Sequence, residues 1–235
     1  MNANPSEHIV KSFDTELERL TGEIVRMGEI SIAQIEAAMD VLERRDSRAA
    51  ERVIANDDAI DDLENVVGHD VVKLLALRQP MARDLREVLA ALRIASDIER
   101  VGDYAANLAK RSMALNLAPP VAHARGLPAL AELAAELMRE VIEAYRERDA
   151  NRAIVARARD AELDTLYTGL FRELLTYMME DPRQITSCTH LLFMAKNIER
   201  IGDHATNIAE NIWTLVHGDE PMPAREKRDF TSTQG

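Results

Sequence analysis

The chain has 235 residues, 41 acidic against 29 basic side chains and a formal net charge of −12. An acidic surface is repelled by nucleic acid and by anionic lipid, so we expect neither of them as a partner. Hydrophobic residues make up 46% of the chain but aromatic residues only 4%, and there are 9 glycines and 8 prolines. This balance favours strong helix formers over the tight turns of a β protein. The composition therefore predicts an all-α protein.

The first half of the chain predicts three helices. Apolar residues recur at helical spacing over about 13–44, then from a candidate N-cap at Asp46 to about Leu77, and then from Pro80 to about Met113. Proline is well tolerated in the first turn of a helix. Three helices with short connections are typical of an antiparallel bundle.

A proline-rich stretch, "LNLAPPVAHARGLP" (115–128), divides the chain. It holds three prolines and a glycine, which mark a break between two periodic regions. We therefore expect one bundle over 8–115, a second over 125–217 and a flexible tail over 218–235. In the second half the helical pattern covers about 128–147, 149–180 and 182–217.

The two halves repeat each other. "IERVGDYAANLA" begins at Ile98 and "IERIGDHATNIA" begins at Ile198, and the second helices align at an offset of 103 through Asp46 and Asp149. Such shared polar residues are not explained by helical bias, and the period is too long for a solenoid repeat. The sequence predicts two tandem, pseudo-symmetric three-helix bundles.

The repeated stretch contains two acids one helical turn apart. Glu99 and Asp103 lie on one stripe of the third helix, pointing away from the apolar seam set by Ile98. Like charges at this spacing cost a few tenths of a kcal/mol, and Gly102 between them costs roughly 1 kcal/mol more than alanine in a helix. The same unfavourable pattern recurs at Glu199, Gly202 and Asp203.

The second helices carry matching acids at the same spacing. Asp57 and Asp61 in the first half align with Asp160 and Asp164 in the second. If adjoining helices direct these acids into one groove, they supply the hard oxygen ligands that Mg, Ca, Mn or iron prefer. The alternative is a solvated acidic surface, with Arg100 or its counterpart in the second half pairing with the acids.

These motifs carry a family resemblance. "IERVGDYAANLA", "IERIGDHATNIAE" and "LRQPMARDLREVLAALRIASDIERVGD" resemble the PhoU family of phosphate-transport accessory and regulatory proteins, over about residues 8–217. The resemblance implies two three-helix bundles whose E/D-x-x-x-D motifs bind metal ions or clusters. By position these motifs are Glu99/Asp103 and Glu199/Asp203, with the second-helix pairs as further ligands. It leaves the metal open among divalent or trivalent ions such as iron, Zn, Mn or Mg.

The resemblance also implies a regulatory role. It predicts a cytoplasmic, homodimeric negative regulator that links the ATPase subunit of a phosphate ABC transporter to a phosphate sensor histidine kinase.

The chain has no window of membrane-span length and no apolar leader, so we expect no membrane insertion. Its one cysteine, Cys188, excludes an internal disulfide.

Three other functions compete with this one. A di-iron carboxylate enzyme requires Glu-x-x-His pairs, and no Glu here has a His three residues on, so we expect no enzyme. A phosphotransfer domain is suggested only by His69 and Lys73, which have no equivalent pair in the second half. A metal-free helical scaffold that binds another transporter or signalling complex stays open.

Overall fold

Helices account for nearly all of the chain that the structure describes. The structure is a computed structural model that describes residues 5–119 and 126–224, with side chains from residue 13 onward. No strand is present in these ranges, so the all-α prediction is confirmed. The elements are α1 (Pro5–Arg44), α2 (Ser47–Ala55), α3 (Asp58–Arg78), α4 (Arg83–Asn116), α5 (Gly126–Glu147), α6 (Ala150–Glu180), a 3-10 turn η1 (Pro182–Gln184) and α7 (Ile185–His217).

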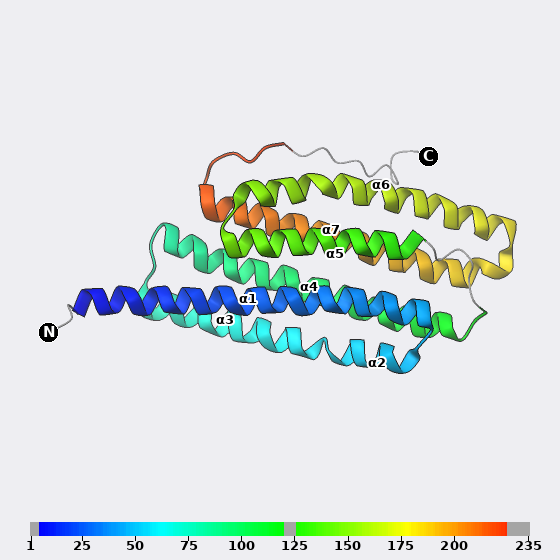
Figure 1. Ribbon diagram of the computed structural model, residues 1–235, viewed down its shortest axis with the longest axis horizontal. Coiled ribbons are helices and arrows are strands. Elements are labelled where there is room, and N and C mark those ends of the chain that lie inside the picture. The colour runs from blue at the N-terminus through cyan, green and yellow to red at the C-terminus, as the bar shows by residue number, and fades with distance from the viewer. Residues whose placement is uncertain (1–4, 120–125, 225–235) are drawn as a thin grey trace.

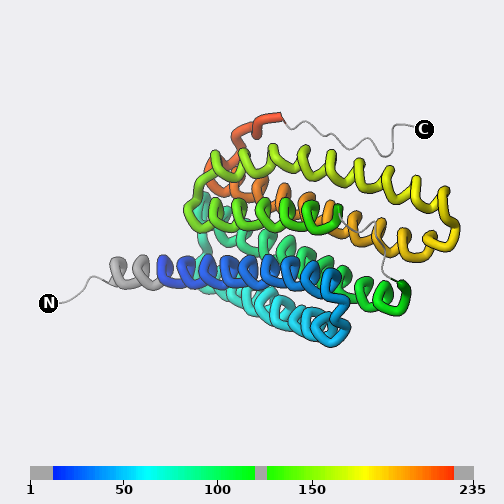
Figure 2. The backbone as a smooth tube through the Cα atoms, turned by 45° about the vertical axis from the view of Figure 1, so that its right-hand side comes forward, coloured from blue at the N-terminus to red at the C-terminus, as the bar shows by residue number. Residues whose placement is uncertain are grey.

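The helices form two bundles that lie side by side (Figure 1). The first contains α1, α2, α3 and α4, and the second contains α5, α6 and α7. The same division is visible in Figure 2, where α2 and α3 together take the place that α6 has in the second bundle. Between the bundles, α4 packs against α7 and α1 packs against α5.

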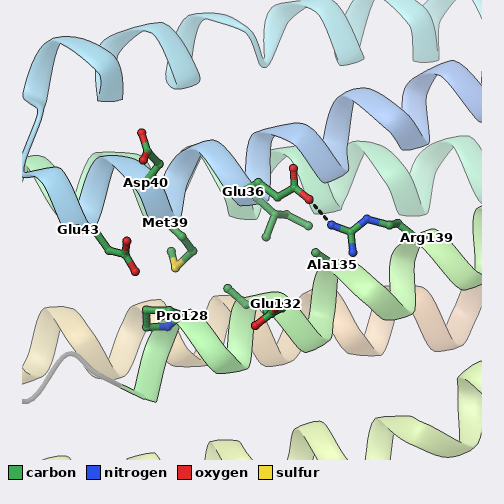
Figure 3. Close-up of a pocket in the computed structure, with 10 residues that line it drawn as sticks. Glu36, Met39, Asp40, Glu43, Pro128, Glu132, Ala135 and Arg139 are labelled. Carbon is green, nitrogen blue, oxygen red and sulfur yellow. Dashed lines mark hydrogen bonds and ion pairs between the residues drawn. The ribbon is translucent and has the colours of Figure 1, made fainter.

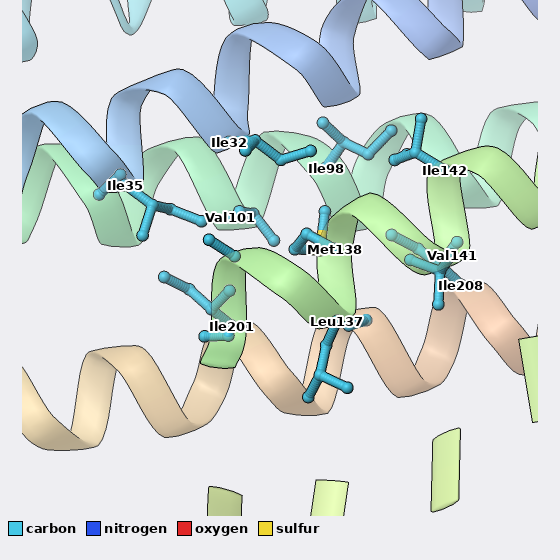
Figure 4. Close-up of a cluster of buried hydrophobic side chains, with 14 of the residues drawn as sticks. Ile32, Ile35, Ile98, Val101, Leu137, Met138, Val141, Ile142, Ile201 and Ile208 are labelled. Carbon is cyan, nitrogen blue, oxygen red and sulfur yellow. The ribbon is translucent and has the colours of Figure 1, made fainter. Parts of the chain in front are cut away.

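One hydrophobic core runs through both bundles. Figure 4 shows residues of α1 and α4 meeting residues of α5 and α7 at the junction. Burial of each such side chain contributes about 1.5–3 kcal/mol, so the junction fixes how the bundles sit against each other. The buried residues labelled there are Ile32, Ile35, Ile98, Val101, Leu137, Met138, Val141, Ile142, Ile201 and Ile208.

The repeat is visible in the local structure of each bundle. Asp46 caps α2 by accepting hydrogen bonds from the backbone N–H groups of Arg48 and Ala49, both at 3.0 Å, and Asp149 caps α6 by accepting one from Arg152 N–H at 3.0 Å. Side-chain caps of this kind satisfy N–H groups that have no partner inside the helix. Both caps were expected from the sequence.

The second helix of the first bundle was expected to run unbroken, and this was wrong. The helix stops at Ala55 and restarts at Asp58, whereas α6 is continuous. The reason is the run Asn56-Asp57-Asp58, because Asn and Asp disfavour helix interiors and favour helix starts, where the positive end of the helix dipole stabilises acids. At the matching place in α6 Asp160 is flanked by Arg159 and Ala161, and the helix continues.

Two smaller expectations also need correction. The third helix begins at Arg83 rather than Pro80, because Gln79 and Ala82 have φ angles of 47° and 48° and interrupt the helix. Residues 218–224 were expected in a flexible tail, yet Trp213 Nε1 donates to Glu220 O at 3.1 Å and Arg157 Nη1 donates to Pro223 O at 3.0 Å. The rest of the tail, 225–235, lies outside the described residues.

The glycines of the repeated motif mark the closest approach between the second and third helices. A Cβ built on Gly102 would lie 2.8 Å from Ile60 Cδ1 and 2.9 Å from Asp57 Oδ1. A Cβ on Gly202 would lie 2.2 Å from Leu163 Cδ2 and 2.7 Å from Asp160 Oδ1. The two bundles therefore make the same contact with an apolar residue and an acid of the neighbouring helix, as the internal repeat predicts.

This contact gives a stability prediction. We expect Gly202→Ala to lower the free energy of unfolding by about 1–3 kcal/mol, because the new methyl group overlaps the buried Leu163 side chain. The matched control is Gly169→Ala, on the exposed side of α6 with no atom within 4 Å of the new Cβ. That change should instead stabilise the protein by about 0.5–1 kcal/mol. Urea denaturation measures both, and equal effects of the two substitutions would contradict the close approach.

Candidate functional site

The acids of the first bundle gather where α3 begins beside the middle of α4. We call Asp57, Asp61, Glu64, Glu99 and Asp103 the first acidic face. The pKa of Asp57 is raised from 3.8 to about 6, chiefly by burial and to a lesser extent by repulsion from Asp103 and Asp61, while Lys110 opposes the rise. The pKa of Glu99 is also raised, chiefly by burial. The positive charge of Arg100 opposes this rise, and repulsion from Asp103, Glu64 and Asp61 adds to it. The five acids are thus close enough to feel one another's charge.

An arginine partly neutralises the first acidic face. Arg100 Nε lies 2.9 Å from Glu99 Oε2, and Arg100 Nη1 donates to Asp103 Oδ2 at 2.9 Å. The arginine that the sequence left as an alternative partner therefore does pair with these acids. Its side chain is 53% exposed, and ion pairs of such exposed arginines contribute little to stability. Arg100 is therefore a weak, displaceable counter-ion.

The second acidic face, which we define as Asp160, Asp164, Glu199 and Asp203, is more enclosed than the first. Asp160, Asp164 and Glu199 are 2%, 5% and 5% exposed, so the expectation that these acids face solvent was wrong for them. The physical reason is the close approach at Gly202, which brings α6 over the acid-bearing stripe of α7.

A lysine replaces the arginine as counter-ion in the second acidic face. Lys196 Nζ lies 2.7 Å from Glu199 Oε2 and 5.3 Å from the centre of the Tyr167 ring. The pKa of Glu199 is raised overall, because the effect of burial exceeds the opposing effect of the contact with Lys196. Arg200, the counterpart of Arg100, lies over the Tyr104 ring at 5.8 Å instead.

Both faces have the donor chemistry of a site for a hard cation. No three His, Cys, Asp or Glu side chains within 5–119 and 126–224 converge closely enough to hold a metal ion as they stand. The first face nevertheless has Asp57 Oδ1 buried without a hydrogen-bond partner, beside the bare Cα of Gly102. A buried carboxylate oxygen without a hydrogen-bond donor is unfavourable, and a bound cation would satisfy it. The residues of the first face therefore fit a hard metal ion.

Sequence reasoning missed three residues at these faces: Gln34 of α1, Glu64 of α3 and Lys196 of α7. Gln34 was detectable in the sequence as a polar residue among apolar ones, and the structure shows it to be 3% exposed. Lys196 was also detectable, because it stands two residues before the second copy of the motif where the first copy is preceded by Ser96. Both are differences between the halves, and the repeated motif identifies only what the halves share.

His204 has a different role from the acids around it. Its Nδ1 lies 2.8 Å from Asp97 Oδ1 on α4, and its ring centre is 5.7 Å from that of Tyr104, its counterpart in the first bundle. Asn207 Nδ2 also donates to Asp97 Oδ1, at 3.3 Å. This polar contact joins α4 to α7, so His204 belongs to the junction between the bundles.

A groove of about 320 Å³ lies between α1 and α5 (Figure 3). Its wall carries Glu36, Asp40, Glu43 and Glu132, and its one basic residue, Arg139, donates a hydrogen bond to Glu36. A groove with this charge attracts cationic groups and repels phosphate.

Comparison with known proteins identifies the family. The family model described as the PhoU domain matches residues 24–112 and again residues 127–212. The chain belongs to the PhoU family. The PhoU-family assignment made from the repeated motif is therefore confirmed, and each match falls within one of the two bundles.

Near full-length relatives support the same assignment. The phosphate-specific transport system accessory protein PhoU homolog of Xylella fastidiosa (strain 9a5c) is 61% identical over 99% of this chain and 98% of its own length. The homolog from Rhizobium meliloti (strain 1021) is 50% identical over 97% of each chain. The crystal structure of PhoU from Pseudomonas aeruginosa matches with a TM-score of 0.85 at 34% identity, over 88% of this chain and 99% of that one.

Both acidic faces lie inside the segments that match the PhoU domain. Glu99 and Asp103 lie in the first match, and Glu199 and Asp203 lie in the second. Within the described ranges, no helix of this PhoU-family chain is both long and apolar enough to cross a membrane.

The raised pKa of Asp57 gives a prediction of pH dependence. Since the pKa is 3.8 when unperturbed and about 6 in the folded protein, the folded state binds more protons than the unfolded state between about pH 4 and pH 6. The free energy of unfolding therefore falls as pH rises through this window. We expect Asp57→Asn to remove part of this fall and to stabilise the metal-free protein near pH 7.5 by about 1–2 kcal/mol, after allowing for solvent screening of this half-exposed group.

Urea denaturation of chelator-treated protein at about pH 4.5 and about pH 7.5 measures the effect. Asp58→Asn is the matched control, because Asp58 is the exposed neighbour at the same helix start. If wild type and Asp57→Asn lose equal stability between the two pH values, Asp57 is not the titrating group.

Proposed function

We propose that this PhoU-family chain is an accessory protein of a phosphate-specific transport system that works by binding other proteins rather than by catalysis. In this role it is a cytoplasmic negative regulator of the phosphate-starvation response. It links the ATPase subunit of the phosphate ABC transporter to the phosphate sensor histidine kinase. The observation that carries the proposal is the pair of PhoU-domain matches, one on each bundle, together with near full-length relatives of that name.

The charge of the molecule supports action through partners. The groove between α1 and α5 is lined by four carboxylates and one arginine, and the chain as a whole carries a net charge of −12. Neither feature favours binding of free phosphate, because like charges repel. Phosphate status then reaches this protein through the transporter, and the acidic surfaces suit basic docking sites on the partners. We propose that the working form is a homodimer.

The acidic faces add a metal-binding role to the proposal. Asp57, Asp61, Glu99 and Asp103 would hold a divalent or trivalent ion in the first bundle, and Asp160, Asp164, Glu199 and Asp203 are the corresponding residues of the second. The metal is iron, Zn, Mn or Mg, all of which accept oxygen ligands. When bound, the ion supplies positive charge that offsets the repulsion among the acids.

A deletion strain tests the regulatory role. Without this protein, we expect phosphate-starvation genes to be transcribed in high phosphate, because the transporter no longer restrains the kinase. Reporter transcription in replete medium is the measurement, and a plasmid copy of the wild-type gene should restore repression. Continued repression in the deletion strain would contradict the regulatory role.

A metal-free scaffold is the second candidate, favoured by the pairing of Arg100 with both Glu99 and Asp103. The variant Glu99→Gln/Asp103→Asn keeps the shape of the face and removes its charged ligands. If metal is required, this variant should fail to restore repression in the deletion strain although it accumulates to the wild-type level. Full restoration would favour the scaffold.

A further inference from the structure

The outer side of α6 is exposed and partly apolar. In the part of the chain that the structure describes, α6 packs against α5, α7 and the short η1, and it lies at the outer edge of the second bundle (Figure 1). Isolated apolar side chains on a surface are ordinary, but several along one helix are typical of a surface that another protein covers. The exposed apolar residues of α6 are Val155, Leu166, Leu175 and Met179, at 61%, 45%, 39% and 77%.

Eight exposed residues form a straight stripe along this side of α6. Steps of three and four residues alternate through the stripe, which is the spacing of a line along which two helices pack. Between residues 155 and 179 the stripe is about 36 Å long, at the rise of an α-helix. We call these residues the α6 stripe: Val155, Ala158, Glu162, Thr165, Gly169, Arg172, Thr176 and Met179.

The α6 stripe has a mirror pattern centred on residue 167. Two positions at equal distance from this centre carry side chains that match in kind or are opposite in charge. When two copies pair antiparallel about a twofold axis at the centre, each residue meets the mirror position of the other copy. The stripe is therefore complementary to itself. Its pairs are apolar Val155 with Met179, small Ala158 with Thr176, acidic Glu162 with basic Arg172, and small Thr165 with Gly169.

Glu162 and Arg172 set the direction of the pairing. They lie about 15 Å apart along the helix axis, so they do not form an ion pair with each other inside one chain. Glu162 is 61% exposed, and the nearby Arg159 is 3.9 Å away and is also held by two other glutamates. In the antiparallel pair, Glu162 faces Arg172 of the partner subunit at two places, one on each side of the axis. A parallel pair in register would instead set each charge against its own copy, which is unfavourable.

The equivalent helix of the first bundle lacks this arrangement. It is broken between α2 and α3, whereas α6 is continuous. At the offset of 103 set by the capping aspartates, Glu162 aligns with Ala59 and Arg172 aligns with His69. The acidic Asp62 stands where the α6 stripe has the small Thr165. The packing of a single bundle therefore does not require the α6 stripe.

We propose that two copies of this chain associate through the α6 stripe, as an antiparallel pair of helices about a twofold axis at residue 167. Thr165 and Gly169 are small, so the two backbones approach closely at the centre. Two ion pairs flank the centre, and Val155 packs against Met179 of the partner subunit at each end. This inference rests on the homodimer of the proposed function and gives that homodimer a surface and a register.

Charge exchange within the full-length protein tests the pairing, with sedimentation velocity over a range of concentrations as the measurement. We expect a dimer in the wild type. Glu162→Arg and Arg172→Glu should each weaken dimerisation at least about 10-fold, because each sets two pairs of like charges against each other across the twofold axis. The double variant Glu162→Arg/Arg172→Glu should restore the dimer. Lys73→Glu, on the exposed side of α3, is the matched control and should leave it unchanged.

Cysteine cross-linking tests the direction of the two helices. Position 155 of one chain should lie beside position 179 of the other, whereas the two copies of position 155 should lie about 36 Å apart, too far for a disulfide. A mixture of Val155→Cys and Met179→Cys proteins should therefore form a disulfide-linked dimer under mild oxidation, and neither protein alone should do so. The wild type is the control, because its one cysteine, Cys188, is buried.

Each contrary outcome overturns a defined part of the inference. A wild type that is monomeric at every concentration would overturn both the homodimer and its surface. A dimer that neither single charge variant weakens would overturn the surface alone. Failure of the double variant to restore the dimer, or cross-linking of Val155→Cys with itself, would overturn the antiparallel register. None of these results alters the expectation for the deletion strain, so they are distinguishable from failure of the regulatory role.

Discussion

The structure depends on the contact that each bundle makes between its second and third helices at a glycine. Asp57 approaches Gly102, and Asp160 approaches Gly202, each beside a buried aliphatic residue. Because the third helix has no side chain at this point, the neighbouring helix moves in and covers Glu99 or Glu199, whose side chains are 13% and 7% exposed. The acid after the glycine stays more open, and the Asp103 side chain is 42% exposed. The glycine contact therefore accounts both for the close packing of the two helices and for the gathering of acids beside it.

The two bundles share this backbone contact at the glycine but differ in the basic residue that pairs with the neighbouring glutamate. In the second bundle the counter-ion is Lys196, whose side chain is 39% exposed, and in the first it is Arg100, whose side chain is 53% exposed. The carboxylate that Lys196 contacts, Glu199, is the more buried of the two glutamates, so loss of the lysine would leave a buried charge uncompensated. The first face can exchange its counter-ion without disturbing the core.

Much of the fold could be predicted because it follows from local rules. Helical periodicity located the helices, side-chain chemistry located the caps at Asp46 and Asp149, and the repeated motif located the bundles. The break between α2 and α3 was missed because the apolar pattern continues through Asn56 and Asp57. The burial of Glu199 was missed because periodicity gives the direction of a side chain on its own helix and not the position of the helix beside it. Gln34 was missed because only the packing of α1 against α4 brings it beside Gly102.

The most direct test of this account is anomalous diffraction from crystals of the full-length protein soaked in Mn²⁺. Data collected near the manganese absorption edge locate the ion without any assumption about its ligands. We predict a strong peak within the first bundle, close to Gly102 and Asp57. Peaks only at scattered surface acids would contradict it.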